Sequence, residues 1–420
     1  MYRKLSAIIS ESDKTMKTGR DCITDDEKRQ WWEHRSLLDQ QLGQLLRNIE
    51  DEWLGGFRGV LQPVDMMFGQ IVSASMITNL RKEIQACIGQ CMSKAYAAKA
   101  KPLSWRTSCA RLNDWLDICS MLWDVYSYQG AAPPGDEASV DSFADQLMQT
   151  MRSFIATNAL SSCRVQAKSQ RPHLILALDK HAQQVPWECL PCLRDYPISR
   201  VPSIAFLQDR ISAMNTLRRG ASPLMTSAPP GVFVDGNRAF YVLNPEGDLL
   251  RTQSNFESFL QAQSGWQGVV GRRPLGHECE QGLSSGDIFL YFGHGGAENY
   301  ISRNQIRKLG RCAVALLFGC SSGLLKLAGE YDAMGTATDY MIGGCPALVG
   351  NLWDVGDKDI DRFAASMLQS WGLDQPANLN ERLASPVSLA EAVCEARRVC
   401  RMAFLTGAAP VVYGIPAYLC

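Results

Sequence analysis

Two apolar runs of the same design constrain the fold of this chain more than any other feature. Residues 287–296 read Asp-Ile-Phe-Leu-Tyr-Phe-Gly-His-Gly-Gly, and residues 313–323 read Ala-Val-Ala-Leu-Leu-Phe-Gly-Cys-Ser-Ser-Gly. Each run is apolar until it stops at glycines and small polar residues, which is typical of strands buried in a parallel sheet. Because reactive groups collect at the carboxyl ends of such strands, we expect His294 and Cys320 to share one edge of the sheet.

A thiol beside an imidazole indicates a cysteine hydrolase, and a peptidase fits best. A free thiol with a pKa near ~8.5 is only slightly ionised at neutral pH, so it needs a base. Cys320 is the predicted nucleophile, and His294 is the predicted general base and later the general acid. We also expect help from the N-terminus of a helix that begins after Ser322. The alternative for Cys320 is a buried structural cysteine.

The rest of the sequence divides into two regions with different hydrophobic patterns. From about residue 26 to 160, apolar residues recur at helical spacing, as in Leu38, Leu42, Leu45, Ile49 and Trp53. After a short strand at residues 174–178 and a loop rich in glycine and proline, strands alternate with helices. The expected strands are 240–243, 268–270, 288–292, 313–318 and 347–353, and the expected helices are 253–263, 357–371 and 389–405. This alternation predicts a doubly wound α/β sheet.

Several segments outside the two runs resemble separase, a cysteine endopeptidase family of the caspase-like clan. They include Trp31-Trp32 with its following helix, residues 185–194 (Val-Pro-Trp-Glu-Cys-Leu-Pro-Cys-Leu-Arg), Tyr241–Asp248 and Asn351–Phe363. The likeness extends from about residue 30 to the end of the chain.

The resemblance implies a caspase-like fold, with a doubly wound, mostly parallel sheet flanked by helices. It also implies a preceding support domain that is helical and pseudo-protease-like. We therefore expect a helical substrate-binding region with a small α/β layer at residues 1–220 and the active protease domain at 225–420. Separases carry a long helical-repeat region before this part, so the chain is expected to be either a fragment or a naturally short form.

The resemblance also assigns roles around the catalytic pair. The backbone N–H groups of Gly295 and Cys320 are expected to form the oxyanion hole. Separases often show His-Gly-x-Gly, whereas this chain has Ala297 at the second glycine. The competing histidines are His181, at the end of a strand, and His277, in a polar loop; we interpret both as surface or structural residues.

An acidic residue after the strand that ends near residue 353 is the candidate for substrate specificity. Asp354 should emerge at the same sheet edge, where its carboxylate would pair with an arginine guanidinium. Trp353 and Asp357 are further substrate-binding candidates. Either Asp354 or Asp357 is instead a candidate cap of the next helix, and we favour Asp357 as the cap. Gly356 stands where the family commonly has threonine.

By resemblance, the enzyme would cleave after arginine in a Glu-x-x-Arg motif of the cohesin kleisin subunit and trigger sister-chromatid separation. Securin would be its inhibitory partner. The second interpretation is another caspase-like clan protease with a different substrate. The third is an inactive scaffold that binds through its helical half. Labelling of Cys320 by an arginyl acyloxymethyl ketone would distinguish a catalytically active site from an inactive scaffold.

Composition narrows the partners and the compartment. The net charge of −1 gives no electrostatic case for nucleic acid or an anionic membrane. Fifteen dispersed cysteines indicate reduced, mostly buried thiols and a location in cytoplasm and nucleus. Cys189 and Cys192 form a lone C-x-x-C pair with no second ligand pair, so no metal or cofactor is expected.

Overall fold

The computed structural model describes residues 2–19, 23–54, 61, 172–218, 229–374 and 385–420. The chain divides into two units, one of residues 1–47 with 173–420 and one of residues 48–172. The first unit contains the sheets and nearly all the described helices, and it is the unit considered below. The second begins with a short π-helix, Ile49–Leu54.

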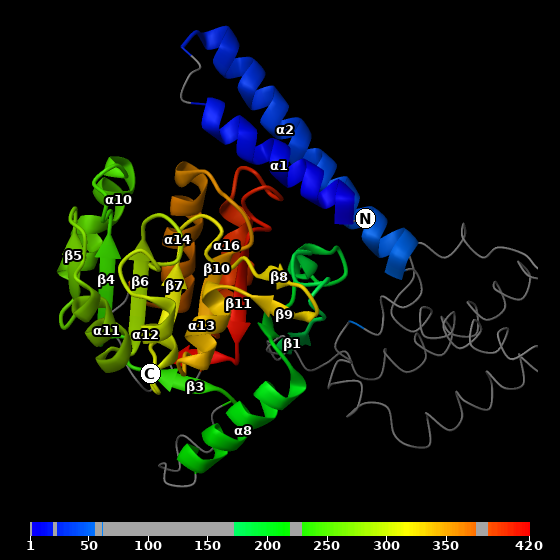
Figure 1. Ribbon diagram of the computed structural model, residues 1–420. Coiled ribbons are helices and arrows are strands. Elements are labelled where there is room, and N and C mark those ends of the chain that lie inside the picture. The colour runs from blue at the N-terminus through cyan, green and yellow to red at the C-terminus, as the bar shows by residue number, and fades with distance from the viewer. Residues whose placement is uncertain (1, 20–22, 55–60, 62–171, 219–228, 375–384) are drawn as a thin grey trace, which may run out of the picture. The chain divides into compact units, whose positions relative to one another are not determined.

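The central element is an eight-stranded sheet with the order β1-β2-β11-β10-β7-β6-β4-β5 (Figure 1). All neighbours are parallel except β10 and β11, so two parallel halves meet at one antiparallel pair. The strands are β1 Leu174–Ala177, β2 Ile198–Val201, β4 Ala239–Leu243, β5 Gln267–Val270, β6 Ile288–Phe292, β7 Val314–Leu317, β10 Ala347–Asn351 and β11 Pro410–Gly414. The predicted mostly parallel α/β sheet is confirmed.

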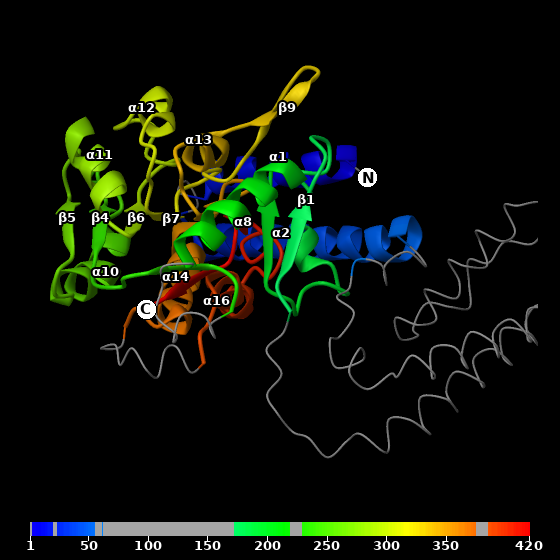
Figure 2. The same ribbon diagram turned by 90° about the horizontal axis from the view of Figure 1, so that it is seen from below.

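Helices cover both faces of this sheet. The view from below places α11, α12 and α13 on one side of the strands and α10, α14 and α16 on the other (Figure 2). Their bounds are α10 Leu250–Ala262, α11 Gly276–Ser285, α12 Arg303–Arg307, α13 Thr336–Ile342, α14 Asp357–Trp371 and α16 Leu389–Ala396. A strand covered on both faces must be apolar throughout, and every residue of β6, β7 and β10 is buried.

Smaller elements complete the described chain. Helix α8 spans Ile204–Arg218, and short 3-10 helices span Trp187–Cys189 and Arg397–Val399. Strands β3 (Val232–Val234) and β12 (Ala417–Leu419) pair in parallel, whereas β8 (Lys326–Ala328) and β9 (Tyr331–Met334) form an antiparallel pair. The sequence pattern did not predict these short strands.

The C-terminal helix is shorter than predicted. We expected a helix over 389–405, but α16 ends at Ala396, and turns follow the 3-10 helix. Two carboxylates explain the difference because they bind backbone N–H groups that a continuing helix would use. Asp359 accepts from the N–H groups of Arg401 and Met402, and Asp39 accepts from those of residues 404 and 405.

The N-terminus is helical from its first described residues. Helix α1 spans Tyr2–Thr18, which the sequence pattern did not predict, and α2 spans Asp25–Asn48, close to the expected start at residue 26. The other helices expected before residue 160 lie outside the described residues, as does residue 220, where a domain boundary was expected. That boundary stays a prediction, and β1 and β2 belong to the same sheet as the strands from β4 onward.

Candidate active site

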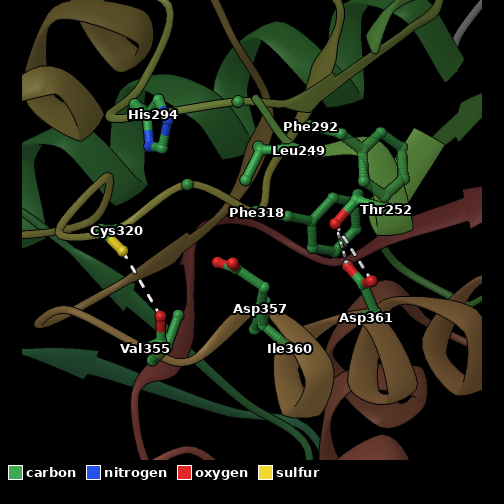
Figure 3. A pocket seen from close by; sticks show the side chains of 12 residues that line it. Leu249, Thr252, Phe292, His294, Phe318, Cys320, Val355, Asp357, Ile360 and Asp361 are labelled. Carbon is green, nitrogen blue, oxygen red and sulfur yellow. Dashed lines mark hydrogen bonds between the residues drawn. The ribbon is translucent and has the colours of Figure 1, made fainter. Parts of the chain in front are cut away.

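The sheet register brings His294 and Cys320 to one edge. Strands β6 and β7 are parallel neighbours, with Tyr291 opposite Leu317. His294 therefore follows the end of β6 by two residues, and Cys320 follows the end of β7 by three. Both line one cavity of about 30 Å³ (Figure 3). The predicted juxtaposition of the two residues is thus what the structure contains.

The backbone after Cys320 turns and does not start a helix. Residues 320–323 form a turn, and the next element is the strand β8. The expectation of a helix beginning after Ser322 is therefore wrong. Ser321 has φ of 53°, a left-handed conformation that a right-handed helix cannot include. No helix dipole from this segment is available to stabilise a thiolate at Cys320.

Two buried side chains fix the turn that carries Cys320. Asn351, the last residue of β10, donates from Nδ2 to Phe318 O (3.3 Å) and Gly319 O (3.0 Å). Ser322 Oγ donates to Leu317 O (3.0 Å) and accepts from the Asn351 N–H (3.1 Å). These bonds connect β7, the turn and β10. The sequence pattern gave no role to either residue.

The two strand ends approach each other so closely that only glycine fits at one position. A Cβ at Gly319 would overlap the carbonyl oxygens of Gly293 and Gly295. Gly295 itself has φ of 67°. Its backbone therefore lies directly against the residue before Cys320, which suits the expected pairing of the Gly295 and Cys320 N–H groups as an oxyanion hole.

The departure from His-Gly-x-Gly falls on a left-handed residue. Ala297 is fully buried and has φ of 69°. The backbone thus keeps the conformation that favours glycine although the side chain is a methyl group. The loop after His294 keeps a glycine-type shape despite the substitution.

His294 is held from two sides. Its carbonyl accepts from Tyr291 Oη (2.7 Å), and its Nε2 lies 2.9 Å from Asp248 Oδ2. Asp248 ends a turn fixed by the buried Asn244, whose N–H donates to Phe292 O and whose Oδ1 accepts from the Leu249 N–H. Sequence reasoning missed Asp248, although the segment 241–248 belonged to the resemblance.

Within the cavity, His294 and Cys320 are hydrogen-bonded to other residues and not to each other. The Cys320 thiol donates to Val355 O at 3.5 Å, while His294 faces Asp248. Figure 3 shows His294 above Cys320 at one side of the cavity, with Asp357 and Asp361 across from them. The thiol is therefore hydrogen-bonded to the main chain and not to His294.

The thiol is surrounded by negative charge. Burial raises the pKa of Cys320 to about 11, and the nearby charges of Asp354, Asp357 and Asp13 act in the same direction. The main chain at Val355 lowers the pKa of the thiol without reversing the shift. Ionisation of this thiol therefore requires a proton acceptor and is favoured by any cation that enters the site.

The structure places Asp354 beside the nucleophile turn. Ser321 Oγ donates to Asp354 Oδ1 at 2.6 Å, and the Ser321 N–H donates to Trp353 O. Trp353 is buried, and its indole donates to Leu405 O at 2.7 Å. Asp354 therefore lies at the predicted sheet edge, and neither Asp354 nor Trp353 is among the residues that line the catalytic cavity. Their substrate-binding roles stay predictions.

The acidic residues at the start of α14 differ from expectation. The N-cap is Gly356, and Asp357 is the first helical residue with its side chain lining the cavity, so the expectation that Asp357 caps the helix is wrong. Further along α14, Asp359 and Asp361 are both buried. Asp361 accepts from Thr252 Oγ1 and from the Asn255 amide, and burial raises its pKa to about 6.

The competing histidines lie away from this cavity. His277 belongs to the first turn of α11 rather than to a loop, and His181 follows β1 in an exposed turn. Cys189 and Cys192 are not joined by a disulfide bond. In the described residues, no group of three or more His, Cys, Asp or Glu side chains is arranged to hold a metal ion. None of the described helices combines the length and apolar composition needed to cross a membrane.

Known proteins match this chain over almost its whole length. A family profile described as "Separin, protease domain" matches residues 1–360. Separin of Schizosaccharomyces pombe is 35% identical over 99% of this chain, that of Saccharomyces cerevisiae 31% over 99%, and that of Mus musculus 32% over 99%. The chain spans only 22%, 25% and 18% of these relatives, respectively.

A solved structure shares the fold. The crystal structure of the Saccharomyces cerevisiae separase–securin complex at 2.6 Å resolution matches with a TM-score of 0.79 and 27% identity. The match covers 100% of this chain and 28% of that chain. Together with the family profile, it shows that this chain belongs to the separin protease-domain family.

Proposed function

We propose that this chain is the catalytic part of a cysteine endopeptidase that cleaves after arginine. The observation that carries the proposal is the placement of Cys320 and His294 in one cavity, at the carboxyl ends of adjacent parallel strands. Membership of a protease-domain family supports the same chemistry.

The proposed reaction uses the two residues in sequence. Since a carboxylate only accepts, the bond to Asp248 places the ring proton of neutral His294 on Nε2 and leaves Nδ1 as the basic nitrogen. His294 takes the thiol proton, and the Cys320 sulfur attacks the scissile carbonyl carbon. The oxyanion is held by the N–H groups of Gly295 and Cys320. His294 then protonates the leaving amine, and a water molecule, deprotonated by His294, hydrolyses the thioester and releases the thiol.

Asp248 is a positioning residue in this scheme. It lies 2.9 Å from the ring and binds the nitrogen that does not accept the thiol proton. A carboxylate in that position fixes the tautomer and stabilises the imidazolium that forms when the thiol ionises. Both roles favour attack by sulfur without any contact between Asp248 and the substrate.

The proposed substrate is the kleisin subunit of cohesin, cut after the arginine of a Glu-x-x-Arg motif. Asp354 would receive that arginine, and its place beside the turn of Cys320 supports the assignment. The proposed cellular role is sister-chromatid separation, with the protein acting in cytoplasm and nucleus. Family membership supports this role.

Securin is the proposed inhibitory partner, lying in the same cleft as a pseudosubstrate. The similarity of the whole chain to the separase of the Saccharomyces cerevisiae separase–securin complex supports this partner.

The proposal is tested by cleavage of a kleisin-derived Glu-x-x-Arg peptide, compared with its Arg→Glu variant. We expect wild-type protein to cut the first peptide only and Cys320→Ser to cut neither. An arginyl acyloxymethyl ketone should label wild-type Cys320, and His294→Ala should slow the labelling. Wild-type protein that neither cleaves the peptide nor is labelled would instead be a binding scaffold.

A further inference from the structure

Three loops meet at the carboxyl ends of β4, β5 and β6, which are neighbours in the sheet (Figure 1). The loop after β4, residues 244–249, carries Asp248, and the loop after β6, residues 293–302, carries His294. The loop after β5, residues 271–275, carries Arg273. The contact between Asp248 and His294 therefore depends on how the first two of these loops are held together.

Glu246 connects all three loops. Its Oε1 accepts from Tyr300 Oη at 2.5 Å, and Tyr300 belongs to the loop of His294. Its Oε2 accepts from Arg273 Nε at 3.0 Å and Nη2 at 2.5 Å. The hydrogen bonds from Tyr300 and then Arg273 hold the pKa of Glu246 below its ordinary value, so this carboxylate is ionised at neutral pH. Hydrogen bonds to an ionised acceptor are roughly twice as strong as those between neutral groups.

The loop of Asp248 needs such a connection at its tip. Asn244 fixes the base of the loop through its backbone N–H and its side-chain oxygen. At the tip, Gly247 has φ of 77°, and a Cβ there would meet nothing within 4 Å, so packing does not hold this part of the loop. Asp248 and His294 are each 48% exposed, and an exposed pair alone is held weakly.

We infer that Glu246, bound by Tyr300 and Arg273, is a positioning residue that holds Asp248 against His294. The inference rests on the proposed mechanism and adds residues that it did not include. Two contacts between the same two loops restrict the imidazole more than one contact does. The three residues line a cavity of about 510 Å³ and are absent from the lining of the catalytic cavity, so they act on His294 through Asp248.

The first test removes one or both of the connections in the full chain. Tyr300→Phe removes a hydroxyl donor and keeps the ring, which lies 6.4 Å from that of Tyr291, whereas Glu246→Ala removes every bond to the carboxylate. We expect kcat for the Glu-x-x-Arg peptide to fall by about threefold in Tyr300→Phe and about fivefold to tenfold in Glu246→Ala. KM should stay unchanged. Iodoacetamide labelling of Cys320 should slow in parallel, because His294 takes the thiol proton there too.

A double-mutant cycle distinguishes positioning from a general loss of structure. In an Asp248→Asn protein the charge that Glu246 positions is already gone. Adding Glu246→Ala to that protein should therefore lower kcat by less than about twofold more. A general loss of structure would instead multiply the two single effects.

Two adjacent arginines provide the matched control. Arg273 binds Glu246, whereas Arg272 binds Glu278 of α11 at 3.0 and 2.8 Å. Arg273→Met should lower kcat by about threefold, as Tyr300→Phe does, and Arg272→Met should leave kcat and KM at their wild-type values. Both arginines are more than half exposed, so neither change should alter the Tm noticeably.

Three results would overturn the inference. The first is a Glu246→Ala protein with wild-type kcat, and the second is a double mutant in which the two effects multiply. The third is a change confined to KM, which would mean that the residues of the larger cavity contact the peptide. In each case cleavage by wild-type protein leaves the proposed function standing. If wild-type protein neither cleaves the peptide nor is labelled, the proposed function fails and the inference fails with it.

Discussion

Asp248 is the residue whose contact with His294 is most direct, and it allows a prediction about the rate of catalysis. Asp248→Asn keeps the size of the side chain but removes the charge that stabilises the imidazolium. We expect kcat to fall by about tenfold, the lower end for a charged hydrogen bond because Asp248 is 48% exposed. KM should change little, since Asp248 is not placed to touch substrate.

The matched control for this change is Asp195→Asn, another exposed carboxylate that is paired with Arg398 at 3.0 Å and lies outside the site. Steady-state kinetics on the Glu-x-x-Arg peptide would separate kcat from KM. An Asp248→Asn enzyme with wild-type kcat would show that the histidine does not depend on this carboxylate.

The residues that sequence could locate differ in kind from those that it could not. His294 and Cys320 each follow a buried strand, so the end of an apolar run marks them. Asn351 carries no such mark, because its role depends on strands that meet only in the folded chain. Asp248 is an intermediate case. The segment 241–248 was recognised as similar to separase, but the contact between Asp248 and His294 was not predicted.

At the scale of elements, the contact between α2 and the loop after α16 allows a prediction about stability and activity. Asp39 Oδ1 accepts from Phe404 N at 2.9 Å and Leu405 N at 2.7 Å. Asp39→Ala leaves two backbone donors without their acceptor, and we expect a loss of about 2–3 kcal/mol in the free energy of unfolding. Activity should fall too, because Leu405 O accepts the indole hydrogen bond of Trp353, the residue before Asp354.

Asp39→Asn is the informative companion, since its amide oxygen still accepts a hydrogen bond. Urea unfolding and kcat/KM on the arginine peptide should place it between wild type and Asp39→Ala. Equal stability of all three proteins would mean that α2 contributes nothing to the loop.

Prediction of helices from the sequence is limited because some helices end at contacts with residues far away in the chain. Helix α14 runs over the predicted residues 357–371 because its apolar face is buried, and Gly372 ends it with φ of 89°. The region 389–405 also has helical periodicity, yet α16 stops at Ala396. Side-chain carboxylates from α2 and α14 bind the later backbone N–H groups, and a local pattern cannot show such distant partners.

At the scale of the whole molecule, sequence alternation predicted a doubly wound sheet but not its strand order. The structure shows two parallel halves joined at β10 and β11, with β1 and β2 beyond them. The segment 185–194 contributes a buried ion pair to this sheet. Its Glu188 is paired with Arg200 of β2 in a fully buried ion pair, with Nε and Nη2 donating to the two carboxylate oxygens at 2.7 and 2.6 Å.

This pair fixes the 3-10 helix Trp187–Cys189 to strand β2. Arg200 also donates to Gln183 O and Val185 O, and Tyr413 of β11 lies opposite it in the sheet register. Burial alone would raise the pKa of Glu188, but the Arg200 guanidinium holds it below its ordinary value. Both groups are therefore charged in the folded protein.

Removal of one partner should destabilise the whole unit. Arg200→Met leaves a buried carboxylate and two carbonyls without donors, so we expect a loss of about 3–5 kcal/mol in the free energy of unfolding. Arg398→Met is the control: its partners Asp195 and Glu395 are exposed, so the change should stay within about 0.5 kcal/mol. Adding Glu188→Leu to Arg200→Met should recover part of the loss, because no unpaired charge remains buried. Denaturant unfolding followed by tryptophan fluorescence would measure all four proteins, and an Arg200→Met protein as stable as Arg398→Met would show that the buried pair does not stabilise the fold.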